Sequence, residues 1–492
     1  MHRAADIALT PALASPRTET APILIAITIF SVLSLAGAIS STGFLEADSC
    51  SHYLYARSAF AEPTYFVNVW GRPFCTGLYA IPAYLGGRLG VRVASLLIAL
   101  SISLIAREIA KGQQWRWPVL ALIFTLAQPL VFLHSFSELT ELPFALLISL
   151  AFWAYQRRQF FWMSAAIAMT PLARPEGFGF IILAGLALLL HRRSWWIVIL
   201  AIPVILWDYT GWRLYGRPGT WWHWLADNWP YAQQSIYTPG SLFHFVMLLP
   251  VVTSSLIFPA TVGGIWLCLR RLRGFFTDHR RRCEILIAVL PLLILVVHSV
   301  LYWRGKMASN GELRYLLVVA PFWSLLANRG WSWFFTRLNW RFPLRAAGAA
   351  ALVPFVLNCI YCVVPLGSQQ DWVEAQEIAN WYRTGDHMQR YPFLATAHPG
   401  IFYYLDLSPD DRTRLREWRK DLIDAVPPHT LLIWDPIYGV FNSDERRSIS
   451  AEELLKAGWK PLPMVWSGDQ TAGKWKVFES PDADIKNPNF RQ

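Results

Sequence analysis

The residues best suited to chemistry follow directly on the first long apolar run, which spans residues 22–38. Two carboxylates stand two positions apart there, and a histidine, a tyrosine and an arginine follow them: Glu46, Asp48, His52, Tyr53 and Arg57. A charged group beside hydrocarbon is costly, and such groups usually serve function. A carboxylate in this place can act as general base toward a hydroxyl or amine. The alternative is that Glu46 and Asp48 only cap a helix expected from Tyr53 to Phe60.

Further charged and polar residues recur where later apolar segments end: His134, Glu138, Glu141, Arg174, Glu176, Arg304, Lys306, Arg314 and, beside it, Tyr315. Arginine suits bidentate binding of phosphate, and carboxylates suit proton removal, so this set favours group transfer from a phosphate carrier. Structural alternatives stay open for several members. Arg174 and Glu176 can pair only with each other across a proline turn. His134 can be a satisfied interfacial histidine, and Glu138 can cap the next helix.

The composition indicates a membrane protein. Of 492 residues, 54% are hydrophobic and 16% are charged, whereas soluble proteins carry about 25% charged residues. The apolar segments predict a polytopic α-helical protein with about 11 transmembrane helices, at 22–38, 89–106, 117–133, 142–155, 160–172, 177–190, 195–209, 241–269, 284–302, 315–327 and 346–366. The first segment loosely resembles a secretory signal, but the later ones favour a retained span. Residues 74–87 are typical of an interfacial helix.

Lysines and arginines are unevenly distributed between the two alternating sets of loops. The set that contains the basic run 270–282 is the richer one, and such loops lie in the cytoplasm. The N-terminus is then cytoplasmic, and the carboxylates and arginines described above share the outer face. We therefore expect a multi-pass protein of the inner cell membrane, surrounded by lipid, with a site open to the exterior. The basic runs act as topological anchors and do not indicate nucleic-acid binding.

Two domains are predicted from a change in polarity near residue 366. Residues 1–366 form the transmembrane domain, with a large first outer loop at 40–88. Residues 367–492 are more polar and alternate helix-like stretches, Trp372–Arg383 and Ala451–Gly458, with strand-like ones, Pro392–Ala397, Thr430–Asp435 and Trp475–Glu479. This alternation predicts a small C-terminal extracytoplasmic α/β domain with a recognition or support role.

The sequence lacks the motifs of nucleotide-dependent and common hydrolytic chemistry. It contains no P-loop, no GxGxxG in a strand–helix context, no HExxH and no GxSxG. Chemistry on the outer face without nucleotides requires a substrate that is already activated, and a sugar on a lipid phosphate already carries its leaving group. No cofactor is required by the sequence, no metal ligands are assigned, and a divalent metal is possible.

Several motifs, in the order and spacing found here, resemble one family. They are Asp48…Tyr53…Ala56-Arg57, Trp70–Tyr79, Gly90–Leu96, Ser137–Pro143, Leu172–Gly177 and Glu312–Pro321. This set is similar to the GT-C-fold, polyprenyl-phosphate-sugar-dependent glycosyltransferases, in particular their ArnT-like and PMT-like branches. The resemblance implies a GT-C-like transmembrane domain and an inverting transfer in which Asp48 is the base, with Glu46 as the alternative. It further implies that Glu141 is a second catalytic acid and that Arg314 holds phosphate.

Other classes of function remain possible. A transporter or flippase for a lipid-linked or anionic substrate would line its path with acids and arginines, but transporters tend to place them near the membrane midplane within repeated halves. A membrane scaffold that displays the C-terminal domain would leave the acids of the first outer loop idle. The leading hypothesis is transfer of a sugar to a hydroxyl or amine of an unknown lipid, glycan or protein acceptor.

Overall fold

The computed structural model describes residues 16–40, 47–216, 219–231, 237–270, 272–338, 343–362, 370–416, 418–420, 426–440, 447–463 and 475–481. The chain divides into two compact units. The first comprises residues 1–44 and 59–366, and the second comprises residues 45–58 and 367–492. The predicted outer loop 40–88 is thus shared between the units, because its residues 45–58 group with the C-terminal part of the chain.

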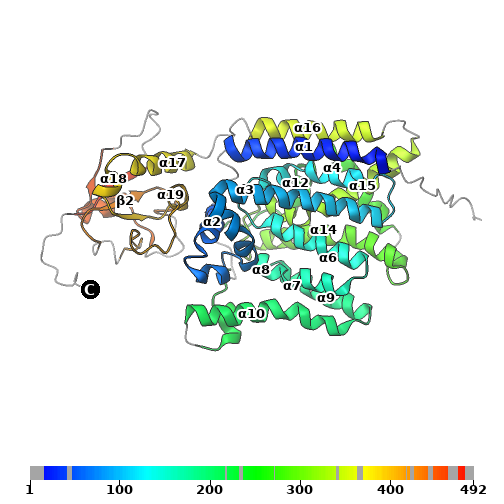
Figure 1. Cartoon of the computed structure of the whole chain (residues 1–492), viewed down its shortest axis with the longest axis horizontal. Helices are drawn as coiled ribbons and strands as arrows, with labels where there is room; N and C mark the ends of the chain where they lie inside the picture. Colours follow the sequence, from blue (N-terminus) through cyan, green and yellow to red (C-terminus); the bar gives the residue numbers. More distant parts are fainter. Residues whose placement is uncertain are drawn as a thin grey trace, which may run out of the picture. The chain divides into compact units, whose positions relative to one another are not determined.

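The first unit is helical, and its longer helices run roughly parallel (Figure 1). The helices are α1 (Pro16–Ser40), α3 (Pro73–Gly112), α4 (Val119–Leu126), α5 (Pro129–His134), α6 (Glu141–Gln156), α7 (Phe160–Ala168), α8 (Thr170–Ala173), α9 (Gly177–Leu190), α10 (Ile197–Tyr215), α11 (Trp224–Asp227), α12 (His244–Thr253), α13 (Phe258–Leu269), α14 (His279–Arg304), α15 (Ala320–Arg337) and α16 (Pro343–Cys362). Short 3₁₀ turns connect some of them: η1 (Pro63–Val67), η2 (Ser194–Trp196), η3 (Trp221–His223), η4 (Leu272–Gly274) and η5 (Leu313–Val319). Helix α6 packs against α3, α7 and η5. This packing brings together the charged residues that lie where these elements begin and end.

In the described part of the chain, four helices are long and apolar enough to cross a membrane, at 19–40, 73–112, 194–215 and 279–304. A fifth candidate is the pair α12 and α13, which is bent by 111°. The predicted number of about 11 spans is therefore not confirmed. Proline explains two of the differences, because its missing N–H interrupts a helix. The segment 117–133 divides into α4 and α5 before Pro129, and 160–172 divides into α7 and α8 near Pro171.

The segment predicted as an interfacial helix is continuous with the next predicted span. Both belong to α3, but the backbone leaves helical geometry at Gly87, with φ 56° and ψ −143°. A positive φ favours glycine, which has no Cβ to clash with the backbone. Gly90, three residues later, lies so close to the carbonyl of Pro82 that a Cβ would overlap with it. The two glycines therefore allow the sharp bend between the two halves of α3.

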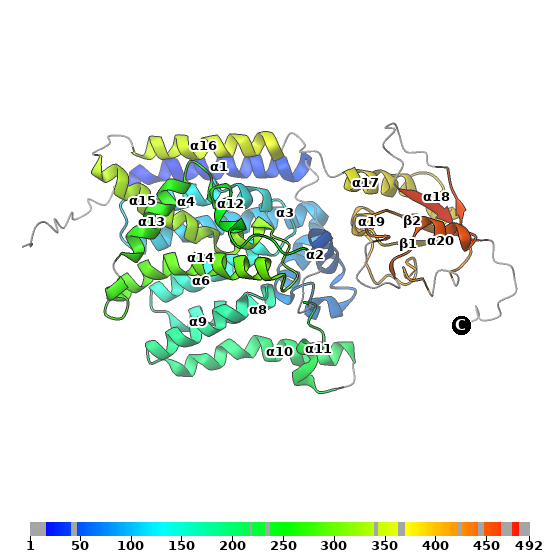
Figure 2. The ribbon, with the colours of Figure 1, turned by 180° about the vertical axis from the view of Figure 1, so that it is seen from behind.

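The second unit is built on a four-stranded sheet in the order β1-β2-β4-β3, of which Figure 2 labels β1 and β2. Its elements are α2 (Ala47–Ser58), α17 (Gln370–Arg383), α18 (His387–Arg390), β1 (Phe393–Thr396), α19 (Pro399–Leu405), β2 (Thr430–Trp434), α20 (Ala451–Lys456), β3 (Lys460–Pro461) and β4 (Lys476–Glu479). Strand β1 pairs with β2 in parallel, and the other pairs are antiparallel. Every residue of β2 is buried. Strands β1, β2 and β4 lie where the sequence predicted strands.

Candidate active site

A buried carboxylate at the start of α6 is the centre of a charged cluster in the first unit. Glu141 is 0% exposed. Arg174 Nη1 donates to its Oε1 at 2.5 Å and to Thr140 Oγ1 at 3.1 Å. Arg314 Nη1 lies 3.6 Å from the same carboxylate oxygen. Two guanidinium groups thus converge on one buried carboxylate, as burial of a charge requires.

Local backbone geometry directs Arg174 toward this cluster. It lies between α8 and α9 in an extended conformation, with φ −159° and ψ 153°. The following residue is Pro175, and a residue before proline is driven out of the helical region. Gly177 then begins α9 so close to the backbone of Pro171 that a Cβ would overlap with it. The Arg-Pro-Glu-Gly sequence is therefore a tight turn between α8 and α9, from which the Arg174 side chain reaches Glu141 at the start of α6.

The same arginine also binds the second carboxylate of this turn. Arg174 Nε and Nη2 donate to Glu176 Oε1 at 3.1 and 3.0 Å. His298 Nε2, from the C-terminal half of α14, lies 3.5 Å from that oxygen. The alternative that Arg174 and Glu176 pair only with each other is wrong, because Arg174 bridges two carboxylates. His298 was not predicted, although an ionisable residue inside an apolar segment is itself a signal of function.

Arg314 and Tyr315 enter the cluster from η5. Arg314 is 7% exposed, and its Nε donates to Glu312. Tyr315 donates its hydroxyl to Asn310 Oδ1 at 2.6 Å, and its ring stacks on His298 with centroids 4.9 Å apart. The guanidinium carbons of Arg174 and Arg314 lie 6.0 and 5.9 Å from the same ring centroid. Tyr315 thus touches both arginines.

Two predicted site residues lie near this cluster with partners of their own. Glu138 is buried and accepts from Arg92 Nε at 3.1 Å, while Arg92 Nη1 donates to the carbonyl of Ala38 at 2.7 Å. This pair joins the end of α1 to α3 and to the turn before α6, a role that was not predicted for Arg92. His134 is buried, and its Nδ1 lies 2.8 Å from the carbonyl of Leu130.

Two other predicted residues lie at the surface. Arg304 and Lys306 are exposed at the end of α14, and the Arg304 guanidinium lies 4.4 Å from the ring centroid of Trp303. Neither has a described contact with Glu141 or Glu176. A direct role for them in substrate binding stays a prediction.

The residues of the first outer loop lie on α2, in the second unit. Asp48 is half-buried in the first turn of this helix, and His52 is buried one turn later. Tyr53 donates its hydroxyl to Asp406 Oδ1 at 2.7 Å, and Arg57 Nε lies 3.0 Å from Asp406 Oδ2. Tyr53 and Arg57, both candidate substrate-binding residues from the sequence, are thus engaged by one carboxylate of the C-terminal part of the chain. Glu46 lies outside the described residues.

Within the described residues, no group of three His, Cys, Asp or Glu side chains is placed to hold a metal ion. The charged cluster of the first unit instead combines three carboxylates, Glu141, Glu176 and Glu312, with the guanidinium groups of Arg174 and Arg314. Guanidinium groups of this kind can also donate to the oxygens of a phosphate, which then competes with the carboxylates for the same N–H donors.

No protein-family model matches the sequence, and no curated protein matches it either. Comparison of folds, however, finds ArnT from Cupriavidus metallidurans. In its apo state that structure superimposes with a TM-score of 0.65 and 12% identity over 94% of this chain and 98% of that one. ArnT from the same organism bound to undecaprenyl phosphate gives a TM-score of 0.63 and 14% identity over 95% and 99% of the two chains. We conclude that the chain has the GT-C fold of ArnT.

Proposed function

We propose that the chain is a membrane glycosyltransferase of the inner membrane that transfers a sugar from a polyprenyl-phosphate carrier to a hydroxyl or amine acceptor on the outer face. One observation carries this proposal. The buried carboxylate of Glu141 lies against the guanidinium groups of Arg174 and Arg314, in a chain that has the fold of ArnT. A structure of ArnT itself holds undecaprenyl phosphate, a lipid-linked anion that arginines suit.

The proposed reaction is a single displacement at the anomeric carbon of the sugar. The carboxylate of Asp48 takes the proton of the acceptor O–H or N–H as general base. The acceptor atom forms a bond to the anomeric carbon, and the bond from that carbon to the phosphate oxygen breaks. The electron pair leaves with the polyprenyl phosphate. Attack opposite the leaving group inverts the configuration.

The two arginines have different proposed roles. Arg174 has carboxylate or hydroxyl acceptors at three of its nitrogens, so we assign it to holding Glu141 and Glu176 in place. Arg314 donates with its Nε to Glu312, and its Nη1 lies 3.6 Å from Glu141. We assign Arg314 to the departing phosphate, where a cation stabilises the charge that develops. Glu141 then acts as the acid that orients both guanidinium groups.

The decisive experiment separates transfer from transport. The purified protein is reconstituted in liposomes with undecaprenyl-phosphate-linked sugars of several kinds and with a lipid and glycan extract as the source of acceptors. Mass spectrometry then measures free undecaprenyl phosphate. We expect its release to depend on both protein and acceptor for at least one donor. A transporter or flippase would leave every donor intact while redistributing it between leaflets, and that result would refute the proposed function.

A further inference from the structure

Helix α2, which carries the proposed base Asp48, is short and depends on its neighbours for its position. It has 12 residues, a length at which isolated helices are marginal in water. Its buried residues are mostly small or polar: Ser49, Cys50, His52, Tyr53, Leu54 and Ala56. Cys50, Tyr53, Leu54 and Ala56 contribute apolar burial, and the buried polar groups of the helix need hydrogen-bond partners within the protein.

One carboxylate supplies two of these contacts. Asp406 accepts from the Tyr53 hydroxyl at 2.7 Å with one oxygen and lies 3.0 Å from Arg57 Nε with the other. The Tyr53 side chain is only 2% exposed, so its hydroxyl needs a partner within the protein. Its ring also meets that of Tyr403 edge to face, with centroids 5.2 Å apart. The contacts with Asp406 lie four residues apart on one face of α2.

Asp406 occupies a backbone position at which glycine is more usual. Asp406 follows the last residue of α19 in the left-handed conformation, with φ 57° and ψ 38°. Glycine is the usual residue at such a helix end, because a Cβ is disfavoured there. Aspartate tolerates this conformation better than most residues. Aspartate therefore combines this conformation with a carboxylate that reaches Tyr53 and Arg57 of α2.

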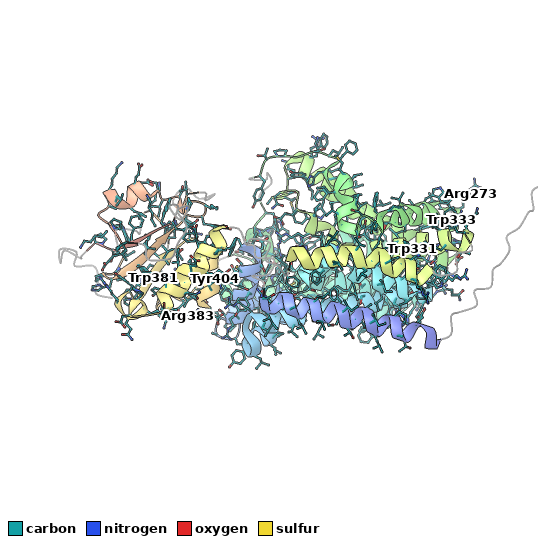
Figure 3. The ribbon with its side chains drawn as sticks, turned by 90° about the horizontal axis from the view of Figure 1, so that it is seen from above. Arg273, Trp331, Trp333, Trp381, Arg383 and Tyr404 are labelled. Atoms are coloured by element: carbon teal, nitrogen blue, oxygen red, sulfur yellow. The ribbon has the colours of Figure 1, made fainter. Side chains whose placement is uncertain are left out.

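The end of α19 is itself held firmly. Arg383 of α17 donates to the carbonyl of Tyr404, and the two residues lie together in Figure 3. The other end of α19 is capped by His398, whose Nδ1 accepts from the N–H of Gly400 at 3.1 Å. Helix α19 packs against both α17 and α2. The carboxylate of Asp406 is thus presented to α2 from a short helix fixed at both ends.

We infer that Asp406 is a positioning residue for the transfer reaction: it fixes α2, and through α2 the carboxylate of Asp48. The inference rests on the proposed function of Asp48 as base. The proposed role of the C-terminal α/β unit is then to hold the helix that bears the base. Tyr53 and Arg57 then act through Asp406 and do not touch the substrate themselves.

The test compares Asp406→Ala, Asp406→Asn and the control Glu452→Ala, which removes an exposed carboxylate of the same unit. Misplacement of a catalytic group by about 1 Å lowers rates on the order of 100-fold. We expect Asp406→Ala to lower kcat about 10- to 100-fold with an unchanged KM for the donor, and to raise hydrogen exchange at residues 47–58. Asp406→Asn, which still accepts from Tyr53, should recover part of kcat. Glu452→Ala should match the wild type in both readouts.

A double-mutant comparison separates this role from direct substrate contact. If Tyr53 acts through Asp406, then Tyr53→Phe and Asp406→Ala together should lower kcat no further than Asp406→Ala alone. Independent, multiplying effects would overturn the inference, and so would an Asp406→Ala protein with wild-type kcat and wild-type exchange in α2. Should Asp406→Ala fail to fold, Tyr53→Phe alone decides by the same kcat and exchange readouts. Failure of the proposed function looks different, because the wild-type protein would then release no polyprenyl phosphate from any donor, and failure of Asp48 as the base would show as an active Asp48→Asn protein.

Discussion

Replacement of Arg174 by methionine tests whether the charged cluster of the first unit is a compensated buried network. Methionine keeps the apolar stem and most of the volume but removes the guanidinium. Glu141, which is 0% exposed, and Glu176, whose side chain is 11% exposed, then lose their main counter-charge. Removal of one partner of a buried ion pair typically costs about 3–5 kcal/mol. Arg314 at 3.6 Å and His298 at 3.5 Å offset part of this loss. We therefore expect a loss of about 3 kcal/mol.

Thermal unfolding in detergent, followed by tryptophan fluorescence, measures this loss. The control is Arg213→Met at the exposed end of α10, which should stay within about 0.5 kcal/mol of the wild type. Adding Glu176→Gln to Arg174→Met should restore part of the stability, because it removes one uncompensated charge. If Arg174→Met melts with the wild type, or if the double variant is less stable than the single one, the reasoning is refuted.

Three further predictions concern donor binding, pH and topology. Arg314→Ala should weaken binding of undecaprenyl phosphate in nanodiscs by about 1.5–3 kcal/mol, whereas Arg213→Ala should not; equal effects would count against the assigned role. Burial raises the pKa of the Asp435 carboxyl above its ordinary value, so its contribution to stability is present at low pH and is lost as pH rises through the raised pKa. Asp435→Asn should therefore raise the melting temperature at pH 8 more than at pH 4, and an equal gain at both would contradict this. An impermeant maleimide should label Glu452→Cys in intact cells but Arg273→Cys only after permeabilisation, and labelling of both from the same side would overturn the predicted orientation.

Short-range signals explain which elements the sequence predicted. The strands at 393–396, 430–434 and 476–479 follow from β-rich stretches between turns, a local pattern. The number of spans was less accessible, since breaks before Pro129 and near Pro171 divide apolar runs that look continuous by hydropathy. Both prolines were visible in the sequence, but whether proline kinks a helix or ends it depends on the neighbouring helices.

Long-range contacts explain what the sequence could not predict about the candidate site. Tyr53 and Asp406 are 353 positions apart, and nothing in a single sequence indicates that they meet. The grouping of α2 with the C-terminal unit could therefore not be predicted from the sequence. His298 is a different case. Its place within an apolar segment was a visible signal, but its partners Glu176 and Tyr315 come from other segments.

The most direct test of the proposed chemistry is the effect of Asp48→Asn on turnover and on donor binding, measured on the same reconstituted protein. Asparagine caps a helix nearly as well as aspartate, so α2 should keep its structure while the base is lost. We expect the release of polyprenyl phosphate to fall about 10²- to 10⁴-fold, with donor affinity unchanged. Wild-type turnover in a well-folded Asp48→Asn protein would contradict the assignment of Asp48 as the base, and the same result for Glu46→Gln and Glu141→Gln would contradict the assignment of the base to any of these three carboxylates.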